Sequence, residues 1–253
     1  MKFGLIGHPI SHSLSPALFK AGYDGRYPYE LIQTADFEEA FDRFLKHYDG
    51  INVTAPFKEL AFAKADIHSQ ECRIIGASNL LVKTPEGIKA YNSDYLGVRM
   101  WLQETADELQ GRRPRALIVG LGGAGKAAAE AARSLGMEVV LMNRTLYSEE
   151  IVPLSGFTSH FREADIIIYN IPTAIEELTR LRQEDLNTGQ PKFILEANYK
   201  NPSFDKVLID KMIGINPLIR YTEGRRWLLY QALTGYELFT GERPDLPAMS
   251  AVL

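Results

Sequence analysis

The chain has 253 residues, of which 45% are hydrophobic and 24% are charged. This composition is typical of an ordinary globular protein and excludes a disordered, fibrous or membrane-embedded chain. The formal net charge of −4, from 28 basic and 32 acidic residues spread along the chain, excludes the basic surface that a nucleic-acid-binding protein needs.

Short strand-like runs alternate with helix-like stretches from one end of the chain to the other, a pattern typical of α/β proteins. In the first part, the runs 2–6, 27–32 and 50–53 predict strands, and the stretches 15–22, 36–47 and 57–65 predict helices. Residues 79–83 and 88–91, separated by the turn-forming Thr84-Pro85-Glu86-Gly87, predict a β-hairpin.

A second series begins after a helical pattern at 94–109 and the polar segment 110–114, which is the best linker candidate. Its expected elements are a strand at 115–119, a glycine loop, an alanine-rich helix to Leu135, and strands at 138–142, 166–169 and 193–195. The last helical stretch, 224–240, is rich in large apolar residues, and we expect it to pack back on the first part of the chain.

The loop 120–125 follows an apolar strand directly and opens a helix, which is the setting in which a GxGxxG pattern indicates dinucleotide binding. Gly120, Gly122 and Gly125 occupy the three glycine positions, with Gly123 and Ala124 between them. Glycines let the backbone approach a pyrophosphate, whose charge is stabilised by the helix N-terminus. The alternative is a glycine-rich turn that binds nothing.

The residues at the end of the next strand distinguish NAD binding from NADP binding. NAD-binding domains usually have an acidic residue there for the ribose hydroxyls, whereas this chain has Asn143, Arg144 and Thr145. Arg144 can pair with a 2′-phosphate, and its two neighbours can donate hydrogen bonds, so the segment favours NADP. Without the glycine loop, a solvated surface charge would be the simpler interpretation of Arg144.

Several ordered segments resemble the shikimate dehydrogenase family. The matching segments are 7–16 (GHPISHSLSP), 52–58 (NVTAPFK), 76–79 (GASN), 92–97 (NSDYLG), the glycine loop, 143–145 (NRT) and Gln231 in LLYQA. The resemblance implies an N-terminal α/β substrate-binding catalytic domain with a mixed sheet, residues 1–97 plus 224–253. A Rossmann-type NADP-binding domain with a parallel sheet would span residues 98–223. The implied activity is the NADPH-dependent reversible reduction of 3-dehydroshikimate to shikimate.

Lys58 and Asp94 are the catalytic pair that the resemblance implies. Hydride reduction of a ketone leaves an alkoxide that must receive a proton, and a positioned lysine can supply it. Asp94 would orient Lys58 and also bind a substrate hydroxyl. Taken singly, a lysine after a strand is usually a surface charge and an aspartate after Asn92 is usually a helix cap.

The resemblance also assigns residues to the substrate, a small cyclic acid with hydroxyl groups. Ser13 and Ser15 would bind its carboxylate, helped by the dipole of the helix that follows. The residues that would contact its hydroxyls are Asn52, Thr54, Asn79 and Gln231, with Tyr199 as a further contact. Asn170, at the end of the strand 166–169, would lie on the cofactor side.

The chain departs from the family pattern in a few places. Leu80 and Ser93 stand where the family usually has threonine. The segment expected to face the nicotinamide also differs, because it has Ile171 and lacks the glycine that the family has a few residues later. The basic residue often found after Arg144 is replaced by Leu146-Tyr147-Ser148-Glu149-Glu150, so NADP would be held less tightly. The segment from Glu196 to Pro202 has one residue more than usual.

Two other functions remain open at this point. One is a quinate/shikimate dehydrogenase that uses NAD; the other is a non-catalytic sensor that keeps the nucleotide site. No metal site is expected, because the spacings His8/His12 and His68/Cys72 lack a third ligand. The single Cys72 and the interrupted apolar N-terminus point to a cytoplasmic protein with no membrane partner. We expect a monomer or a homodimer.

Overall fold

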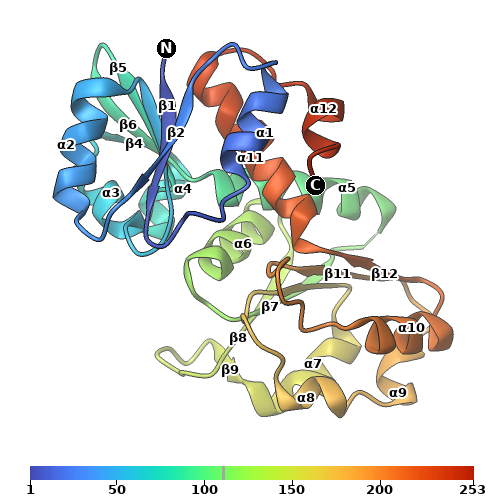
Figure 1. Ribbon diagram of the computed structural model, residues 1–253. Helices are drawn as coiled ribbons and strands as arrows, with labels where there is room; N and C mark the ends of the chain where they lie inside the picture. The colour runs from blue at the N-terminus through green and yellow to red at the C-terminus, as the bar shows by residue number, and fades with distance from the viewer. Residues whose placement is uncertain (110–111) are drawn as a thin grey trace. The chain divides into compact units, whose positions relative to one another are not determined.

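The computed structural model describes residues 1–109 and 112–253, so part of the predicted linker 110–114 lies outside the described residues. The chain forms two compact units, residues 1–97 with 228–253 and residues 98–227. Two helices, α5 (Ser93–Glu108) and α11 (Gly224–Thr240), begin in one unit and end in the other (Figure 1). None of the described helices is both long enough and apolar enough to cross a membrane.

The first unit is built on a six-stranded mixed sheet, as predicted, with the order β2-β1-β3-β5-β6-β4. Its strands are β1 (Phe3–Gly7), β2 (Tyr29–Gln33), β3 (Gly50–Val53), β4 (Ile67–His68), β5 (Leu80–Thr84) and β6 (Gly87–Tyr91). Its helices are α1 (Ser15–Gly22), α2 (Phe37–His47), α3 (Lys58–Lys64), α4 (Gln70–Ile75), α12 (Leu246–Ser250) and the adjoining parts of α5 and α11. β5 and β6 form the predicted hairpin and are antiparallel.

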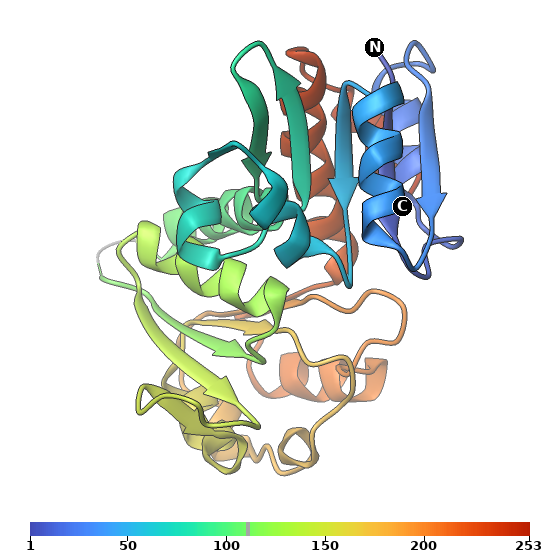
Figure 2. The ribbon, with the colours of Figure 1, turned by 90° about the vertical axis from the view of Figure 1, so that its left-hand side faces the viewer.

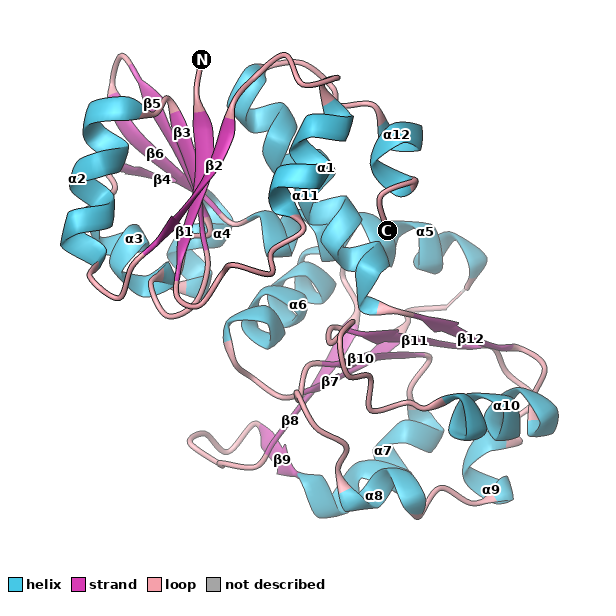
Figure 3. Cartoon of the chain, in the orientation of Figure 1, coloured by secondary structure: helices cyan, strands magenta, loops and turns pink. Residues whose placement is uncertain are grey.

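Successive side chains along each strand point to opposite faces of this sheet, and packed side chains cover both faces. Phe3 of β1 stacks on Phe239 of α11, with ring centroids 4.9 Å apart, and lies 5.3 Å from Phe19 of α1. Ile6, on the opposite face, belongs to a buried cluster with Phe44 of α2. Figure 3 shows the strands between α2 on one side and α1 with α11 on the other.

Small residues let α5 and α11 approach closely in the first unit. A Cβ at Gly97 of α5 would lie 2.5 Å from the backbone nitrogen of Gln231 in α11. One turn away on each helix, a Cβ at Gly235 would lie 3.2 Å from the Cβ of Ser93. This crossing places Gln231 beside the helical turn that begins with Ser93 and Asp94.

We expect Gly97→Val to lower the free energy of unfolding by about 1–3 kcal/mol, because the side chain would overpack the helix crossing. Gly214 in α10 is the matched control, since nothing lies within 4 Å of a Cβ placed there. Gly214→Ala should stabilise by up to about 1 kcal/mol, since alanine is the better helix former. Urea denaturation measures both. Equal stability of the two variants would show that α5 and α11 do not depend on this close approach.

The second unit is a six-stranded parallel sheet of the Rossmann type, with the order β9-β8-β7-β10-β11-β12. Its strands are β7 (Arg115–Val119), β8 (Glu138–Asn143), β9 (Ile151–Pro153), β10 (Ile166–Tyr169), β11 (Lys192–Glu196) and β12 (Ile219–Thr222). Its helices include α6 (Gly123–Ser134), α7 (Phe157–Glu163), α8 (Glu176–Thr179), α9 (Gln183–Leu186), α10 (Lys206–Ile215) and the 3-10 turn η1 (Leu154–Gly156). Figure 1 and Figure 2 show α6 on one face of the sheet and α7 on the other.

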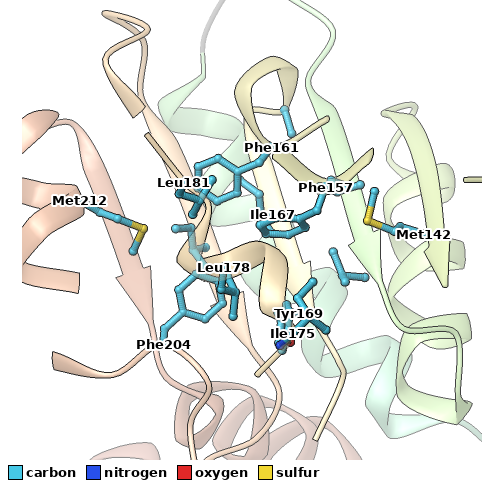
Figure 4. Close-up of a cluster of buried hydrophobic side chains, with 14 of the residues drawn as sticks. Met142, Phe157, Phe161, Ile167, Tyr169, Ile175, Leu178, Leu181, Phe204 and Met212 are labelled. Carbon is cyan, nitrogen blue, oxygen red and sulfur yellow. The ribbon is translucent and has the colours of Figure 1, made fainter. Parts of the chain in front are cut away.

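A buried cluster joins this sheet to the helices on the face opposite α6. Phe157 and Phe161 of α7 pack with Ile167 and Tyr169 of β10, and Met142 of β8 completes the same cluster (Figure 4). The four residues from α7 and β10 are fully buried, so the cluster is a core rather than a surface contact. It fixes the sheet whose carboxyl edge carries the glycine loop.

A buried lysine caps the C-terminal end of α7. The ammonium of Lys192, at the start of β11, donates to the carbonyl oxygens of Phe161, Arg162 and Ala164 at 2.8, 2.8 and 2.6 Å. These carbonyls end the helix and have no further turn to bond within it. Burial lowers the pKa of Lys192 to about 8, with Asp165 acting in the opposite direction. The side chain is therefore a helix cap inside the core.

Candidate active site

One edge of the first unit's sheet gathers the residues that the sequence singles out. β1 and β3 are parallel and end together, because Ile6 pairs with Val53. The antiparallel β5 begins at the same edge, where Leu80 pairs with Asn52 of β3 and with Tyr91, the last residue of β6. The segments that follow β1, β3 and β6 and the one that precedes β5 therefore converge at this edge.

Lys58 and Asp94 meet at this edge. The Lys58 Nζ lies 2.5 Å from Asp94 Oδ2, and the two side chains are 24% and 11% exposed. Lys58 is the first residue of α3, and its carbonyl oxygen accepts from the backbone N–H of Ser78 at 2.9 Å. The ammonium is thus held by its partner, and the Lys58 side chain remains partly exposed.

Asn79 connects the strand edge to the helix that carries Asp94. Its Oδ1 accepts from the backbone N–H of Ser93 at 2.6 Å and from the Ser93 hydroxyl at 3.2 Å. Its carbonyl oxygen accepts from Asn52 Nδ2 at 3.3 Å. Since Asn79 is buried, these bonds fix the first turn of α5 relative to β3. The predicted hydroxyl-binding residues Asn52 and Asn79 are therefore neighbours.

Ser13 and Ser15 also lie together, on the loop that enters α1. The Ser13 hydroxyl donates to Ser15 Oγ at 3.1 Å, and the Ser15 backbone N–H donates back to Ser13 Oγ at 3.2 Å. Both residues are partly exposed, and Ser15 opens α1. The arrangement places two hydroxyls at a helix N-terminus, which suits a carboxylate ligand.

Thr54 follows β3 directly. Its backbone N–H donates to the carbonyl oxygen of Ile6 at 2.9 Å, and its carbonyl oxygen accepts from Phe57 at 3.0 Å. Its methyl group would lie 2.4 Å from a Cβ at Gly7, so the loop after β1 can pass this close only with a glycine. Thr54 therefore belongs to the same edge as Asn52 and Lys58.

In the second unit, the glycine loop has the geometry that its sequence predicts. Gly120 has φ +86°, a conformation that side chains disfavour, and its N–H donates to the carbonyl oxygen of Met142 at 2.8 Å. A Cβ at Gly125 would lie 1.9 Å from the carbonyl oxygen of Gly120, so no larger residue fits there. Gly122 and Gly123 are exposed, with open space where a Cβ would be. The N-terminus of α6, which Ala124 continues, is open to a pyrophosphate.

The segment after β8 is tied to this loop. Asn143 Oδ1 accepts from the N–H of Leu121 at 3.4 Å, and its Nδ2 donates to the carbonyl oxygen of Thr145 at 3.1 Å. Arg144, between them, is exposed. Asn143 therefore acts as a spacer that fixes Arg144 relative to the glycine loop, which suits a ligand that carries both a pyrophosphate and a further phosphate.

Asn170 follows β10 on the strand adjacent to β7. Its backbone N–H donates to the carbonyl oxygen of Val119 at 2.7 Å, and its Nδ2 donates to that of Ile168 at 3.3 Å. Its Oδ1 is buried and has no hydrogen-bond partner within residues 1–109 and 112–253. A buried acceptor of this kind needs a donor, and a bound cofactor can provide one. The open glycine loop and this acceptor together fit a dinucleotide.

Ile171 does not disturb the strand end. Its side chain is 7% exposed and belongs to the same buried cluster as Phe157 and Tyr169. A Cβ at Gly120 would lie 2.8 Å from Ile171 Cγ1, so the isoleucine packs directly beneath the glycine loop. The apolar residue is therefore accommodated by turning inward.

Tyr199 lies on a well-braced loop after β11. The buried carboxylate of Glu196 accepts from the N–H groups of Ser203 and Phe204 and from the Tyr221 hydroxyl, the last at 2.8 Å. Asn198 Nδ2 donates to the carbonyl oxygen of Pro172, at 2.9 Å. The longer loop is thus tied both to β12 and to the segment after β10.

Sequence reasoning missed a residue that is hydrogen-bonded to Asn52, one of the predicted substrate-binding residues. The hydroxyl of Tyr29, in β2, donates to Asn52 Oδ1 at 2.8 Å. No motif contains Tyr29, and a tyrosine at the start of a strand is typical of ordinary packing. Only the strand order, with β2 and β3 on either side of β1, brings it near Asn52.

Comparisons with known proteins match segments of both units to dehydrogenases. Residues 5–81 match a family model described as the shikimate dehydrogenase substrate binding domain. Residues 78–195 match one described as D-isomer specific 2-hydroxyacid dehydrogenase, NAD binding domain. A shikimate dehydrogenase (NADP(+)) of Thermus thermophilus is 34% identical, covering 98% of this chain and 96% of its own. One from Staphylococcus epidermidis is 30% identical, covering 100% and 97%.

Solved structures are similar over the whole chain. Shikimate 5-dehydrogenase of Thermus thermophilus, in complex with NADP(H) and shikimate, has a TM-score of 0.79 and 27% identity, covering 100% of this chain and 98% of its own. Shikimate dehydrogenase of Mycobacterium tuberculosis has a TM-score of 0.80 and 26% identity, covering 100% and 99%. A quinate dehydrogenase of Corynebacterium glutamicum in complex with NAD, at 22% identity, shares the fold with a TM-score of 0.81 and coverage of 100% and 98%.

Proposed function

Because this chain belongs to the shikimate dehydrogenase family, we propose that it catalyses the NADPH-dependent, reversible reduction of 3-dehydroshikimate to shikimate. It is an oxidoreductase that acts on a CH–OH group. The observation that carries the proposal is the 2.5 Å contact between Lys58 and Asp94 at the edge that also holds the serine pair and Asn52. An acid and its orienting carboxylate beside hydroxyl- and carboxylate-binding groups are what this reaction requires.

In the proposed reaction, NADPH supplies the hydride to the ketone carbon. The Lys58 ammonium donates a proton to the oxygen that becomes the new hydroxyl, and Asp94 holds the ammonium in place. In the reverse direction, the same side chain would accept the proton of the substrate hydroxyl, and bound NADP would accept the hydride. Ser13 and Ser15 bind the carboxylate, and Asn52, Thr54, Asn79 and Gln231 orient the hydroxyls, with Tyr199 as a further contact.

The second unit would hold the cofactor. Gly120, Gly122, Gly123, Ala124 and Gly125 surround the pyrophosphate position, where the exposed N-terminus of α6 favours negative charge. The 2′-phosphate would be met by Arg144, with Asn143 and Thr145 beside it. The buried acceptor of Asn170 would receive a donor from the bound cofactor.

A spectrophotometric assay at 340 nm tests the proposal, with shikimate or quinate and with NADP or NAD. We expect shikimate with NADP to give the highest kcat/KM. Higher activity with quinate and NAD would replace the proposal with a quinate/shikimate dehydrogenase. Binding of NADP with no turnover of either substrate would leave a nucleotide sensor.

The cellular location and the oligomeric state of the protein remain predictions. A cytoplasmic location is checked by cell fractionation, and the expected monomer or homodimer by light scattering after gel filtration. A membrane-associated fraction would contradict the first prediction, and a tetramer or larger assembly would contradict the second.

A further inference from the structure

Two tyrosines contact predicted substrate-binding residues of the first unit. Tyr29 of β2 and Tyr236 of α11 have ring centroids 6.0 Å apart. Phe19 of α1 packs against both, at 4.7 and 4.8 Å. Aromatic side chains from three elements therefore fix where the two hydroxyls can lie, because a tyrosine has few rotatable bonds.

The two hydroxyls are bonded to groups expected to bind the substrate. Tyr29 donates to Asn52 Oδ1 at 2.8 Å, and Tyr236 donates to the carbonyl oxygen of Ser15 at 3.1 Å. Ser15 in turn bonds Ser13. One packed pair of tyrosines therefore holds both Asn52 and the loop of the predicted carboxylate-binding serines.

Neutral hydroxyls suit this position. Burial raises the pKa of Tyr29 and of Tyr236 well above the usual value for tyrosine. Both hydroxyls consequently stay protonated over the pH range in which the enzyme would work. They can donate to Asn52 and to Ser15 at the same time as they exclude a charge that would repel an anionic substrate.

Asn52 shows how the bond from Tyr29 acts on a predicted ligand-binding group. A carboxamide has two orientations that differ by exchange of its oxygen and nitrogen. Here Oδ1 accepts from Tyr29 and Nδ2 donates to the carbonyl oxygen of Asn79 at 3.3 Å, so only one orientation satisfies both partners. We expect the second N–H of Nδ2 to donate to a hydroxyl oxygen of the substrate.

We propose that Tyr29 and Tyr236 are positioning residues for substrate binding: Tyr29 orients the carboxamide of Asn52, and Tyr236 holds the backbone of Ser15, which carries one of the two serine hydroxyls. This inference rests on the proposed function, because it takes the Asn52 and serine groups to contact the substrate. The pair determines how tightly the ring is held and leaves the proton transfer at Lys58 unchanged.

The test compares Tyr29→Phe and Tyr236→Phe with Tyr23→Phe. Tyr23 is the matched control, because its ring also packs on Phe19, at 5.0 Å, and its buried hydroxyl donates to the carbonyl oxygens of Tyr236 and Glu242 at 2.8 and 3.0 Å. Each variant thus loses one buried tyrosine hydroxyl from the same aromatic cluster. Only in Tyr29 and Tyr236 does that hydroxyl face Asn52 or Ser15.

We expect each of the two test variants to raise KM for shikimate about 10-fold at saturating NADP, with kcat and the pH profile within about 2-fold of wild type. Tyr23→Phe should keep the wild-type KM while losing a comparable amount of stability in urea. If Tyr236→Phe does not fold, Tyr29→Phe, which lies partly at the surface, carries the test.

The possible failures are distinguishable. A wild-type protein with no turnover of shikimate would overturn the proposed function, and this inference with it. Wild-type turnover with an unchanged KM in Tyr29→Phe and Tyr236→Phe would overturn the tyrosine inference alone. An equal rise of KM in all three variants would show a general effect of loosening the aromatic cluster and would also overturn it.

Discussion

Lys58→Ala should lower kcat by about 100- to 10,000-fold, the usual contribution of a positioned general acid, while KM for shikimate changes by less than about 5-fold. The reason is that the ammonium contributes most when the ketone oxygen gains charge in the transition state. Steady-state rates in both directions measure the effect. A mutant with the wild-type kcat would remove Lys58 from the mechanism.

The helix that carries Lys58 supplies a matched control. Lys64 lies on the same helix α3, and its ammonium forms a 2.8 Å ion pair with Glu38 at an exposed position. Lys64→Ala should keep kcat within about 2-fold, because a surface pair contributes little. A loss of activity in Lys64→Ala equal to that in Lys58→Ala would mean that α3 is sensitive to any lysine change.

Lys58→Arg separates the charge of the side chain from its acidity. Arginine keeps a cation next to Asp94, but a guanidinium does not give up its proton at ordinary pH. We therefore expect Lys58→Arg to remain strongly impaired in kcat. Near-wild-type turnover would indicate that residue 58 acts as a fixed positive charge and that the proton comes from elsewhere.

Arg144→Ala should raise KM for NADP about 10- to 100-fold and leave KM for NAD nearly unchanged, because a charge-assisted bond to the 2′-phosphate contributes about 1.5–3 kcal/mol. The expected consequence is a large loss of preference for NADP over NAD. Initial rates with each cofactor at saturating shikimate measure it.

Arg180 is the control for this change. It is an arginine of the same unit, it is exposed, and it pairs with Glu176 at 2.5 Å. Arg180→Ala removes the same charge and should alter neither cofactor constant by more than about 2-fold, because surface pairs contribute little. If Arg144→Ala raised KM for NADP and NAD equally, the residue would contact a part common to both cofactors, and another group would choose between them.

The segment after Arg144 adds no positive charge to this site. Glu149 and Glu150 follow it, and Glu150 lies 3.7 Å from Arg133 of α6. The Glu150 carboxylate is therefore paired with the Arg133 guanidinium. We therefore expect the cofactor preference to depend mainly on Arg144, which is why its replacement is among the changes with the largest expected effects.

The sequence by itself determined the longer local elements and the glycine loop. The strands 50–53, 115–119 and 166–169 and the helices 15–22 and 224–240 have the bounds that their patterns predict. Long periodic stretches, capping residues and glycine turns act within a few residues, so they can be recognised without the fold. The same holds for the glycine loop, because its strand, turn and helix are consecutive.

The short elements could not be predicted in this way. β4 has two residues and β9 has three, and α8 and α9 have four each. Such segments carry too few residues for a period to appear, and they form because the rest of the unit offers them partners. Lys192 is a further case, since a lysine at the start of a strand gives no sign that it will cap a buried helix.

Only the tertiary structure decided which polar residues meet. Lys58 and Asp94 are 36 residues apart, and they come within 2.5 Å because β3 and β6 end at the same edge of a mixed sheet. Tyr236 reaches Ser15 across 221 residues, because α11 packs beside α1. Sequence patterns record the preferences of neighbours along the chain, whereas these contacts depend on strand order and on the close crossing of helices. Burial of apolar surface, which acts at any separation along the chain, selects both.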